Sequence, residues 1–308
     1  MSLRDLFVAA YGRFADGSRA VEEPGLAVVA IDERTGRPAG VVRLRARVGR
    51  YVAAIVGRHD RCDLYLDGSE ELALRHLVVI VDPVSDYAKG ASVAYRVLDL
   101  RTRDGFCDEH GRQLRGMRCE GPAIVRCAGY AIFALPLGDP TDWPQSPADA
   151  WAYLPERVYF DELAHVPEHS RAKIPCLPRA RDHRSCITIT HGPRDSGEML
   201  VGAGDLIGML EVEGPMGKGV LHVGAQALTD GVLLGRYARC DGGLADDPSM
   251  SRVHALLVRV EDTLLAIDVA STNGTARRGE PPTRLVELDR EAELLLGKGT
   301  RARWRWLS

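Results

Sequence analysis

The chain has 308 residues, of which 45% are hydrophobic and 27% are charged, the usual composition of a soluble globular protein with about two domains. Collagen-like, coiled-coil and wholly disordered chains are therefore excluded. The 40 basic and 43 acidic residues nearly cancel, so the chain has no excess positive field to attract nucleic acid or an anionic membrane.

Short β-branched runs separated by glycine and aspartate predict strands in both halves of the chain. Residues 77–81 and 93–100 are such runs in the first half, and residues 255–260 and 264–267 are such runs in the second. The polar residues 261–263 suit a tight hairpin between the last two. Many short strands with polar turns favour β-sandwiches over a parallel sheet alternating with helices, so the predicted fold class is all-β.

The middle of the chain differs in composition from the segments on either side of it. Residues 139–196 are rich in proline and contain one helix-compatible stretch, residues 148–163. We interpret this segment as a Pro-rich, partly helical linker, which places one domain at residues 26–138 and the other at residues 197–308.

An internal repeat relates the two halves. Residues 57–63 (GRHDRCD) and 235–241 (GRYARCD) agree at five of seven positions, and each half has a histidine 19 residues after its first glycine. The next matching stretch, which ends at Gly105 in the first half and at Gly274 in the second, requires about nine extra residues in the first copy. Residues 82–92 form the loop expected to hold them, so we predict two copies of one β fold.

Three motifs of the second copy occur in a specific order: Gly235-Arg236, residues 251–254 (SRVH) and residues 271–275 (STNGT). Together they resemble the forkhead-associated (FHA) domain, a module that binds phosphothreonine peptides, over about residues 205–308. The resemblance implies an eleven-stranded β-sandwich whose loops bind the peptide at one end. The first copy then becomes an FHA-like domain.

The residue types suit phosphate recognition, because a phosphate dianion needs charge-assisted donors on a rigid frame. Arg236 supplies a planar guanidinium that stays protonated, Ser251 can donate its hydroxyl, and Arg252 can add a further donor. By resemblance, Thr272 borders the phosphothreonine and Asn273 hydrogen-bonds the peptide backbone.

Three further residues are expected to support these loops. Gly235 and Gly274 allow turns or close backbone approach, and the resemblance makes His254 a scaffold residue. Arginines on loops are usually solvated and Asn-Gly is a common hairpin turn, but the three motifs together favour the phosphopeptide interpretation. A hydrolase triad of Ser251, His254 and Asp268 is rejected, because no nucleophile-elbow sequence surrounds the serine.

The first copy departs from the motif where phosphate would bind. It keeps Arg58 and His76, but Ala73, Leu74 and Asp104 stand where Ser251, Arg252 and Asn273 stand in the second copy. Two donors are lost and a negative charge is added, which opposes phosphate binding. We predict a degenerate domain that packs against the second domain, dimerises, or makes a phosphate-independent contact, so a homo-oligomer through this domain remains open.

No cofactor and no metal are predicted. The linker concentrates potential zinc ligands, but their spacings match no zinc-finger pattern; they are His165, His169, Cys176, His183, Cys186 and His191. The seven cysteines include no CxxC pair, which indicates reduced thiols. The first residues lack an apolar signal core and no uncharged apolar run approaches the roughly 18 residues of a membrane helix, so we expect a cytoplasmic protein.

These observations predict a non-enzymatic adaptor in Ser/Thr-kinase signalling. Its partner would be a threonine-phosphorylated protein, either a kinase or a kinase substrate, with no nucleic-acid or membrane partner. Asp241, Asp246 and Asp247 near the expected pocket suggest a target with basic residues beside its phosphothreonine. The alternatives are a phosphate-independent scaffold or oligomerisation protein built from FHA-like domains, and an enzyme with a metal-dependent site in residues 139–196.

Overall fold

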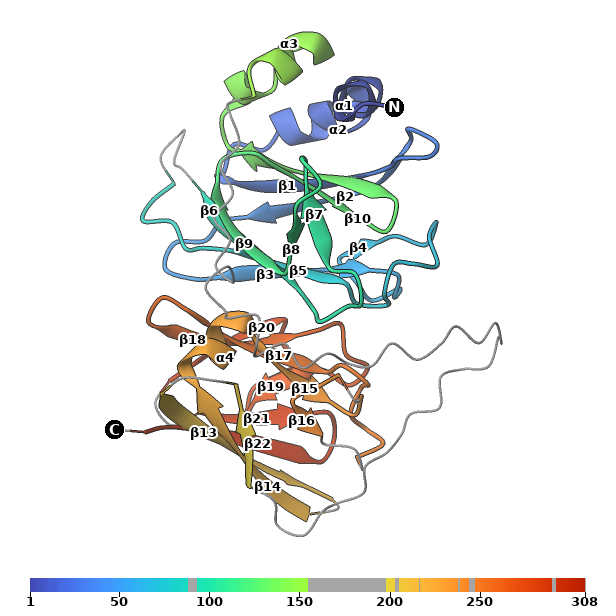
Figure 1. The fold of residues 1–308 in the computed structure, drawn as a ribbon. Helices are drawn as coiled ribbons and strands as arrows, with labels where there is room; N and C mark the ends of the chain where they lie inside the picture. Colours follow the sequence, from blue (N-terminus) through green and yellow to red (C-terminus); the bar gives the residue numbers. More distant parts are fainter. Residues whose placement is uncertain are drawn as a thin grey trace. The chain divides into compact units, whose positions relative to one another are not determined.

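The computed structural model has two compact units, Met1–Leu163 and Ala164–Ser308 (Figure 1). Both consist mainly of β-sheet, which confirms the all-β prediction. No helix in the described parts is long and apolar enough to cross a membrane. The described residues are 1–87, 93–154, 198–202, 205–215, 217–237, 239–243, 247–289 and 292–307.

The first unit is a sandwich of two sheets. One sheet has the strand order β2-β1-β11-β10-β7-β8 and the other has the order β4-β3-β5-β6-β9. The strands are β1 (Gly25–Asp32), β2 (Pro38–Arg45), β3 (Val52–Gly57), β4 (Leu64–Tyr65), β5 (Leu77–Val81), β6 (Ala94–Asp99), β7 (Phe106–Asp108), β8 (Gln113–Leu114), β9 (Gly116–Glu120), β10 (Ala123–Cys127) and β11 (Tyr130–Leu137).

The first core follows from the two-residue period of its strands. Val28 on β1, Val79 on β5 and Ile132 on β11 belong to one buried cluster that fills the space between the sheets. The run expected at residues 77–81 is β5, and the run expected at residues 93–100 contains β6. These eleven strands agree with the number that the family resemblance implies.

Three helices cover the outer face of the six-stranded sheet, and the sequence analysis predicted only the last of them. They are α1 (Leu3–Ala10), α2 (Gly12–Arg19) and α3 (Pro147–Ala152), with a 3-10 turn at Pro140–Asp142 (Figure 1). Phe7, Tyr11 and Phe14 pack with Phe133 of β11 and with Trp143 in a second buried cluster. Aromatic pairs such as Phe7 and Phe133, whose ring centroids lie 5.5 Å apart, add stability beyond their buried area.

The signal for α1 was present in the sequence. The Ser2 hydroxyl accepts the Asp5 N–H and the Asp5 carboxylate accepts the Ser2 N–H, which is a capping box. Leu3, Leu6, Phe7 and Ala10 follow with helical spacing. α3 begins within one residue of the helix-compatible stretch 148–163, of which residues 155–163 lie outside the described part.

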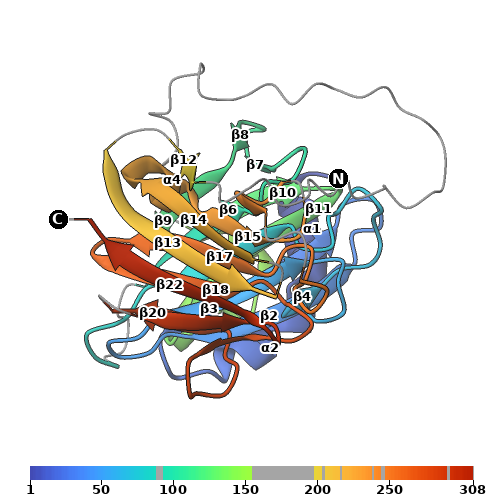
Figure 2. The same ribbon diagram turned by 90° about the horizontal axis from the view of Figure 1, so that it is seen from below.

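The second unit repeats this topology. Its sheets have the orders β12-β14-β13-β22-β21-β19 and β16-β15-β17-β18-β20, which match the first unit except that β12 is added at one edge and no strand corresponds to β8 among the described residues. Figure 2 shows β13 between β14 and β22. The elements are β12 (Glu198–Val201), β13 (Leu206–Gly214), β14 (Gly217–Gly224), α4 (Ala225–Asp230), β15 (Val232–Gly235), β16 (Gly242–Gly243), β17 (Ala255–Val260), β18 (Thr263–Asp268), β19 (Thr275–Arg277), β20 (Leu285–Leu288), β21 (Glu293–Leu296) and β22 (Thr300–Trp306).

The strand registers locate the extra residues of the first copy. Leu77 pairs with Asp99, 22 residues later, across the β5–β6 hairpin. Ala255 pairs with Asp268, only 13 residues later, across the β17–β18 hairpin. The difference of nine lies in the β5–β6 connection, as the sequence predicts.

Cys127 at the end of β10 gives a pH-dependent test of the first core. Burial, with smaller effects of Asp99 and Glu33, raises the pKa of this thiol from 9.0 to about 12. The folded state keeps a proton that the unfolded chain releases above pH 9. Above pH 9, the Cys127 thiol should therefore lower the free energy of unfolding. Its contribution should approach about 1.4 kcal/mol per pH unit.

Urea unfolding of the wild type and Cys127→Ala at pH 8, 9 and 10 measures this loss. The variant lacks the titrating thiol but keeps every other ionisable group, so its stability should fall less steeply with pH. Parallel losses in the two proteins would contradict the prediction.

Candidate functional site

A single loop, residues 247–251 between β16 and β17, holds Arg236 in place. The Arg236 Nε donates to the Met250 carbonyl at 2.5 Å, and the Arg236 backbone N–H donates to the Ser251 carbonyl at 3.2 Å. The two terminal nitrogens of Arg236 make no hydrogen bond within the described part of the chain. The half-buried guanidinium is therefore fixed at its base and keeps its terminal donors for an anion.

The same loop contacts Thr272 and Asn273. The Ser251 Oγ accepts the Thr272 backbone N–H at 2.9 Å and lies 3.4 Å from the Thr272 Oγ1. The Asn273 Nδ2 donates to the Ser249 carbonyl at 2.6 Å. Four of the five predicted binding residues are thus joined through one short segment, although they come from three separate motifs.

Arg252, the fifth predicted residue, is exposed, and its side chain makes no hydrogen bond or ion pair within the described residues. Its backbone is well fixed, because its carbonyl accepts the Tyr237 N–H at 2.8 Å and the Cys240 thiol at 3.4 Å. Arg252 therefore has a fixed backbone next to Ser251, and its guanidinium has no hydrogen-bond or ion-pair partner within the described residues.

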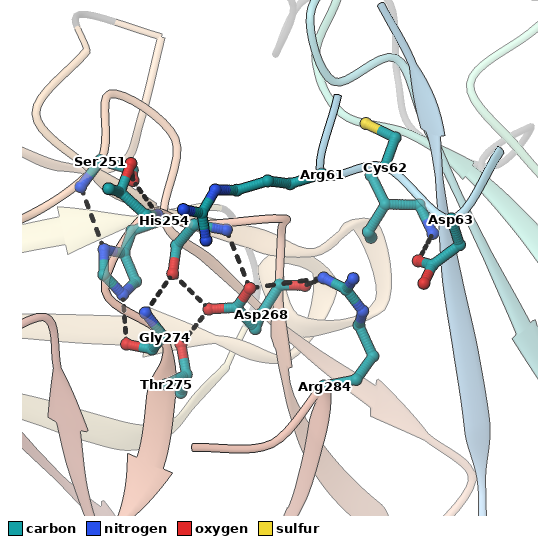
Figure 3. Close-up of polar contacts among 12 residues, drawn as sticks. Arg61, Cys62, Asp63, Ser251, His254, Asp268, Gly274, Thr275 and Arg284 are labelled. Carbon is teal, nitrogen blue, oxygen red and sulfur yellow. Dashed lines mark hydrogen bonds and ion pairs between the residues drawn. The ribbon is translucent and has the colours of Figure 1, made fainter. Parts of the chain in front are cut away.

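His254 joins the two halves of the site. Its Nδ1 accepts the Ser251 N–H at 3.1 Å, and its Nε2 lies 2.9 Å from the Gly274 carbonyl (Figure 3). Because a carbonyl only accepts, Nε2 carries the proton and the ring is neutral. Both ring nitrogens are engaged by backbone groups, so His254 is not placed to take a proton from the Ser251 hydroxyl.

Asp268 organises the loop that follows β18. Its carboxylate accepts the Ser271 N–H at 2.9 Å, the Ser271 hydroxyl at 2.5 Å and the Thr275 hydroxyl at 2.9 Å, and it lies 3.4 Å from Arg284 (Figure 3). The Ser271 hydroxyl in turn accepts the Gly274 N–H at 2.9 Å. Asp268 therefore shapes the turn that carries Asn273.

The two predicted glycines meet different demands. A Cβ at Gly235 would lie 2.4 Å from the Arg252 carbonyl oxygen, so close backbone approach requires glycine there. Gly274 has φ +82°, and a Cβ would lie 2.6 Å from the Pro282 Cβ. Here the left-handed backbone and the lack of space both favour glycine.

Asp247 ties the 247–251 loop to β22, a role that the sequence analysis missed. Its buried carboxylate accepts the Ser249 N–H at 2.8 Å and the Thr300 hydroxyl at 2.7 Å. Burial pushes the pKa of Asp247 upward, but the hydrogen bonds from Ser249 and Thr300 outweigh it and hold the pKa below its ordinary value of 3.8. The charged form therefore stabilises the loop.

These contacts correct the expectation that acidic residues face the peptide. The Asp241 carboxylate accepts the Leu233 N–H at 2.9 Å, and Asp247 is 5% exposed. Two of the three carboxylates thus serve the fold, and Asp246 lies outside the described residues.

The first unit has the same histidine bridge and arginine anchor as this site but lacks the serine hydroxyl. His76 bridges the Ala73 N–H at 3.1 Å and the Gly105 carbonyl at 2.9 Å. The Arg58 Nε donates to the Leu72 carbonyl at 3.2 Å. The frame is retained, but Ala73 has no hydroxyl at the position of Ser251.

The aspartate expected to replace Asn273 lies exposed in the first unit. The Asp104 side chain is 78% exposed and its Oδ1 lies 3.8 Å from the Arg103 Nε. An exposed pair of this kind offsets the negative charge weakly. The histidines and cysteines of the linker, for which no metal site is predicted, lie outside the described residues, within which no group of three or more potential metal ligands occurs.

Comparison with known proteins identifies the second unit. The model of the FHA domain family matches residues 232–297. Similar solved structures include the FHA-1 domain of Mycobacterium tuberculosis Rv1747, with 22% identity over 33% of this chain and 99% of that chain and a TM-score of 0.27. They also include the FHA domain of Chlamydia trachomatis CT664, with 21% identity over 33% of this chain and 99% of that chain and a TM-score of 0.29. No curated protein matches the chain.

The second unit is therefore a β-sandwich in which residues 232–297 match the FHA domain family. The first unit is a degenerate FHA-like copy, with its corresponding strands in the same order and the same histidine bridge but without the serine and asparagine.

Replacement of Asp247 by asparagine tests its part in the loop. The variant keeps the shape but loses the charge, and hydrogen bonds to charged groups contribute about 1.5–3 kcal/mol each. At pH 7 we expect Asp247→Asn to unfold with a free energy lower by about 1–3 kcal/mol.

The difference should also depend on pH. Because the folded pKa of Asp247 is depressed, its contribution is present above pH 3.8 and is lost as the pH falls through the folded pKa. Urea unfolding of both proteins at pH 7, 4 and 3 checks this, and a gap that stays constant with pH would argue against it.

Proposed function

We propose that this protein is a phosphothreonine-peptide-binding adaptor that captures its partner through the FHA domain of the second unit. The observation that carries the proposal is the state of Arg236, whose Nε is fixed to the Met250 carbonyl while its terminal nitrogens point to no acceptor in the described chain. A guanidinium held in this way is prepared for a phosphate dianion, because little side-chain freedom is lost on binding.

Ser251 supports the same proposal. Its Oγ accepts the Thr272 N–H at 2.9 Å, but its distance of 3.4 Å to the Thr272 Oγ1 is long for an O–H···O bond. The hydroxyl proton is therefore weakly held and can turn toward a phosphate oxygen. Arg252 adds an uncommitted cation beside it.

Asn273 provides the contact that would convert phosphate binding into peptide recognition. One hydrogen of its Nδ2 is used by the Ser249 carbonyl, which fixes the side-chain amide. The second hydrogen and the amide oxygen are then positioned for the N–H and C=O groups of an extended peptide.

We propose that the partner is a threonine-phosphorylated protein in Ser/Thr-kinase signalling, either the kinase or its substrate. The engagement of both ring nitrogens of His254 by backbone groups supports a binding role over hydrolysis. The missing Ser and Asn of the first unit favour a phosphate-independent contact there, including self-association.

Arg236→Ala is the direct test, and the repeat supplies a matched control. Charge-assisted hydrogen bonds contribute about 1.5–3 kcal/mol each, so we expect phosphothreonine-peptide affinity to fall about 10- to 100-fold. Arg58→Ala removes the same charge and the same Nε anchor from the degenerate copy and should leave affinity unchanged.

Fluorescence anisotropy with an oriented phosphothreonine library, with unphosphorylated and phosphoserine controls, measures both variants. Equal losses in Arg236→Ala and Arg58→Ala would place binding elsewhere. Absence of any phosphate-dependent binding would favour the scaffold alternative.

Asn273→Asp introduces into the second unit the residue that occupies the equivalent position in the first. It removes the Nδ2 donor and adds a carboxylate near the phosphate, so we expect binding at least about 10-fold weaker than wild type. Asn273→Ala removes the donor alone and should bind better than Asn273→Asp.

The difference between these two variants reports the charge repulsion. It should shrink as salt rises from about 0.05 to 0.5 M, because exposed charges are screened. Equal affinity of the two variants at low salt would show that the carboxylate does not face the phosphate.

A further inference from the structure

The described cations of the second unit fall into three groups. One is Arg239, whose Cζ lies 5.7 Å from the ring centroid of Tyr237. Eight others in the described residues lie within 4 Å of a carboxylate, including Arg305, whose Nη2 lies 3.2 Å from Glu211. They are Lys218, Arg259, Arg277, Arg278, Arg284, Arg301, Arg303 and Arg305. Arg236, Arg252 and Lys298 form no ion pair within the described residues, and all three lie at the candidate site.

Lys298 is fixed to this site by its backbone. It lies in the turn between β21 and β22, where its N–H donates to the Ser249 Oγ at 2.9 Å. Ser249 is the residue whose carbonyl accepts the Asn273 amide at 2.6 Å. The preceding Gly297 N–H donates to the Gly274 carbonyl at 3.2 Å. The backbone of Lys298 is therefore fixed on the side of the site where Asn273 lies, and its side chain is exposed there.

The carboxylates of the described site loops accept hydrogen bonds from groups of the fold. Asp241 accepts the Leu233 N–H, Asp247 accepts the Thr300 hydroxyl, and Asp268 is held by the residues of its own turn. A phosphate dianion can be matched by Arg236 and Arg252. Lys298 then remains as a positive charge beyond the phosphate.

We propose that the peptide carries an acidic residue next to its phosphothreonine, on the side that Asn273 contacts, and that Lys298 selects it. This inference rests on the proposed function and specifies the class of phosphopeptide. It reverses the preference for basic residues that the sequence alone suggested.

The test compares phosphothreonine peptides that differ only in having glutamate, alanine or lysine at the positions on either side of the phosphothreonine. An exposed ion pair contributes about 0.2–1 kcal/mol, so we expect affinity to decrease from glutamate to alanine to lysine, by about 1.4- to fivefold for each step in charge. The preference should weaken as salt increases.

Lys298→Gln should reduce the glutamate-over-lysine ratio and leave binding of the alanine peptide nearly unchanged. Arg305→Gln removes the same charge toward the opposite end of β22 and should preserve the ratio. Phosphothreonine peptides that bind equally well, or best with lysine, would overturn the inference alone. If no phosphothreonine peptide binds, the proposed function fails and the inference fails with it.

Discussion

The bridge made by His254 is the contact on which the rest of the site depends. The ring lies with 0% of its surface exposed, accepts the Ser251 N–H and donates to the Gly274 carbonyl. Two loops that are 20 residues apart in sequence are thereby held at a fixed separation by a neutral side chain. A buried ring without these partners would cost free energy, so the bridge and the loop conformations stabilise each other.

The first unit keeps the supporting contacts of the site but has lost two of the groups that would bind a phosphopeptide. His76, Arg58 and the glycine at position 57 have the same contacts as their counterparts, and a Cβ at Gly57 would lie 2.5 Å from the Leu74 carbonyl oxygen. These residues are needed to form the sandwich end whether or not phosphate binds there. Ala73 and Asp104 occupy positions that the frame does not constrain, which is why donors can be lost without loss of the fold.

The repeat explains how much the sequence could predict. The strands and the histidine bridge recur at matched positions, so each copy supports the interpretation of the other. The role of Asp247 could not be predicted from the repeat. Its hydrogen-bond partner Thr300 lies 53 residues away, and the two residues meet only when β22 has paired in its sheet. α1 could have been predicted from its capping box, since that signal is local.

The folding of the loops also produces the charge distribution at the site. Where a strand reverses into a loop, backbone N–H groups lose their sheet partners and need other acceptors. Asp247 and Asp268 each accept such an N–H, from Ser249 and Ser271, and Asp241 accepts the N–H of Leu233 within β15. On β13 and β21, by contrast, Glu211 and the largely buried Glu293 form ion pairs with arginines of β22. The described carboxylates nearest the site are thus hydrogen-bonded to backbone N–H groups, whereas Arg236, Arg252 and Lys298 form no ion pair within the described residues.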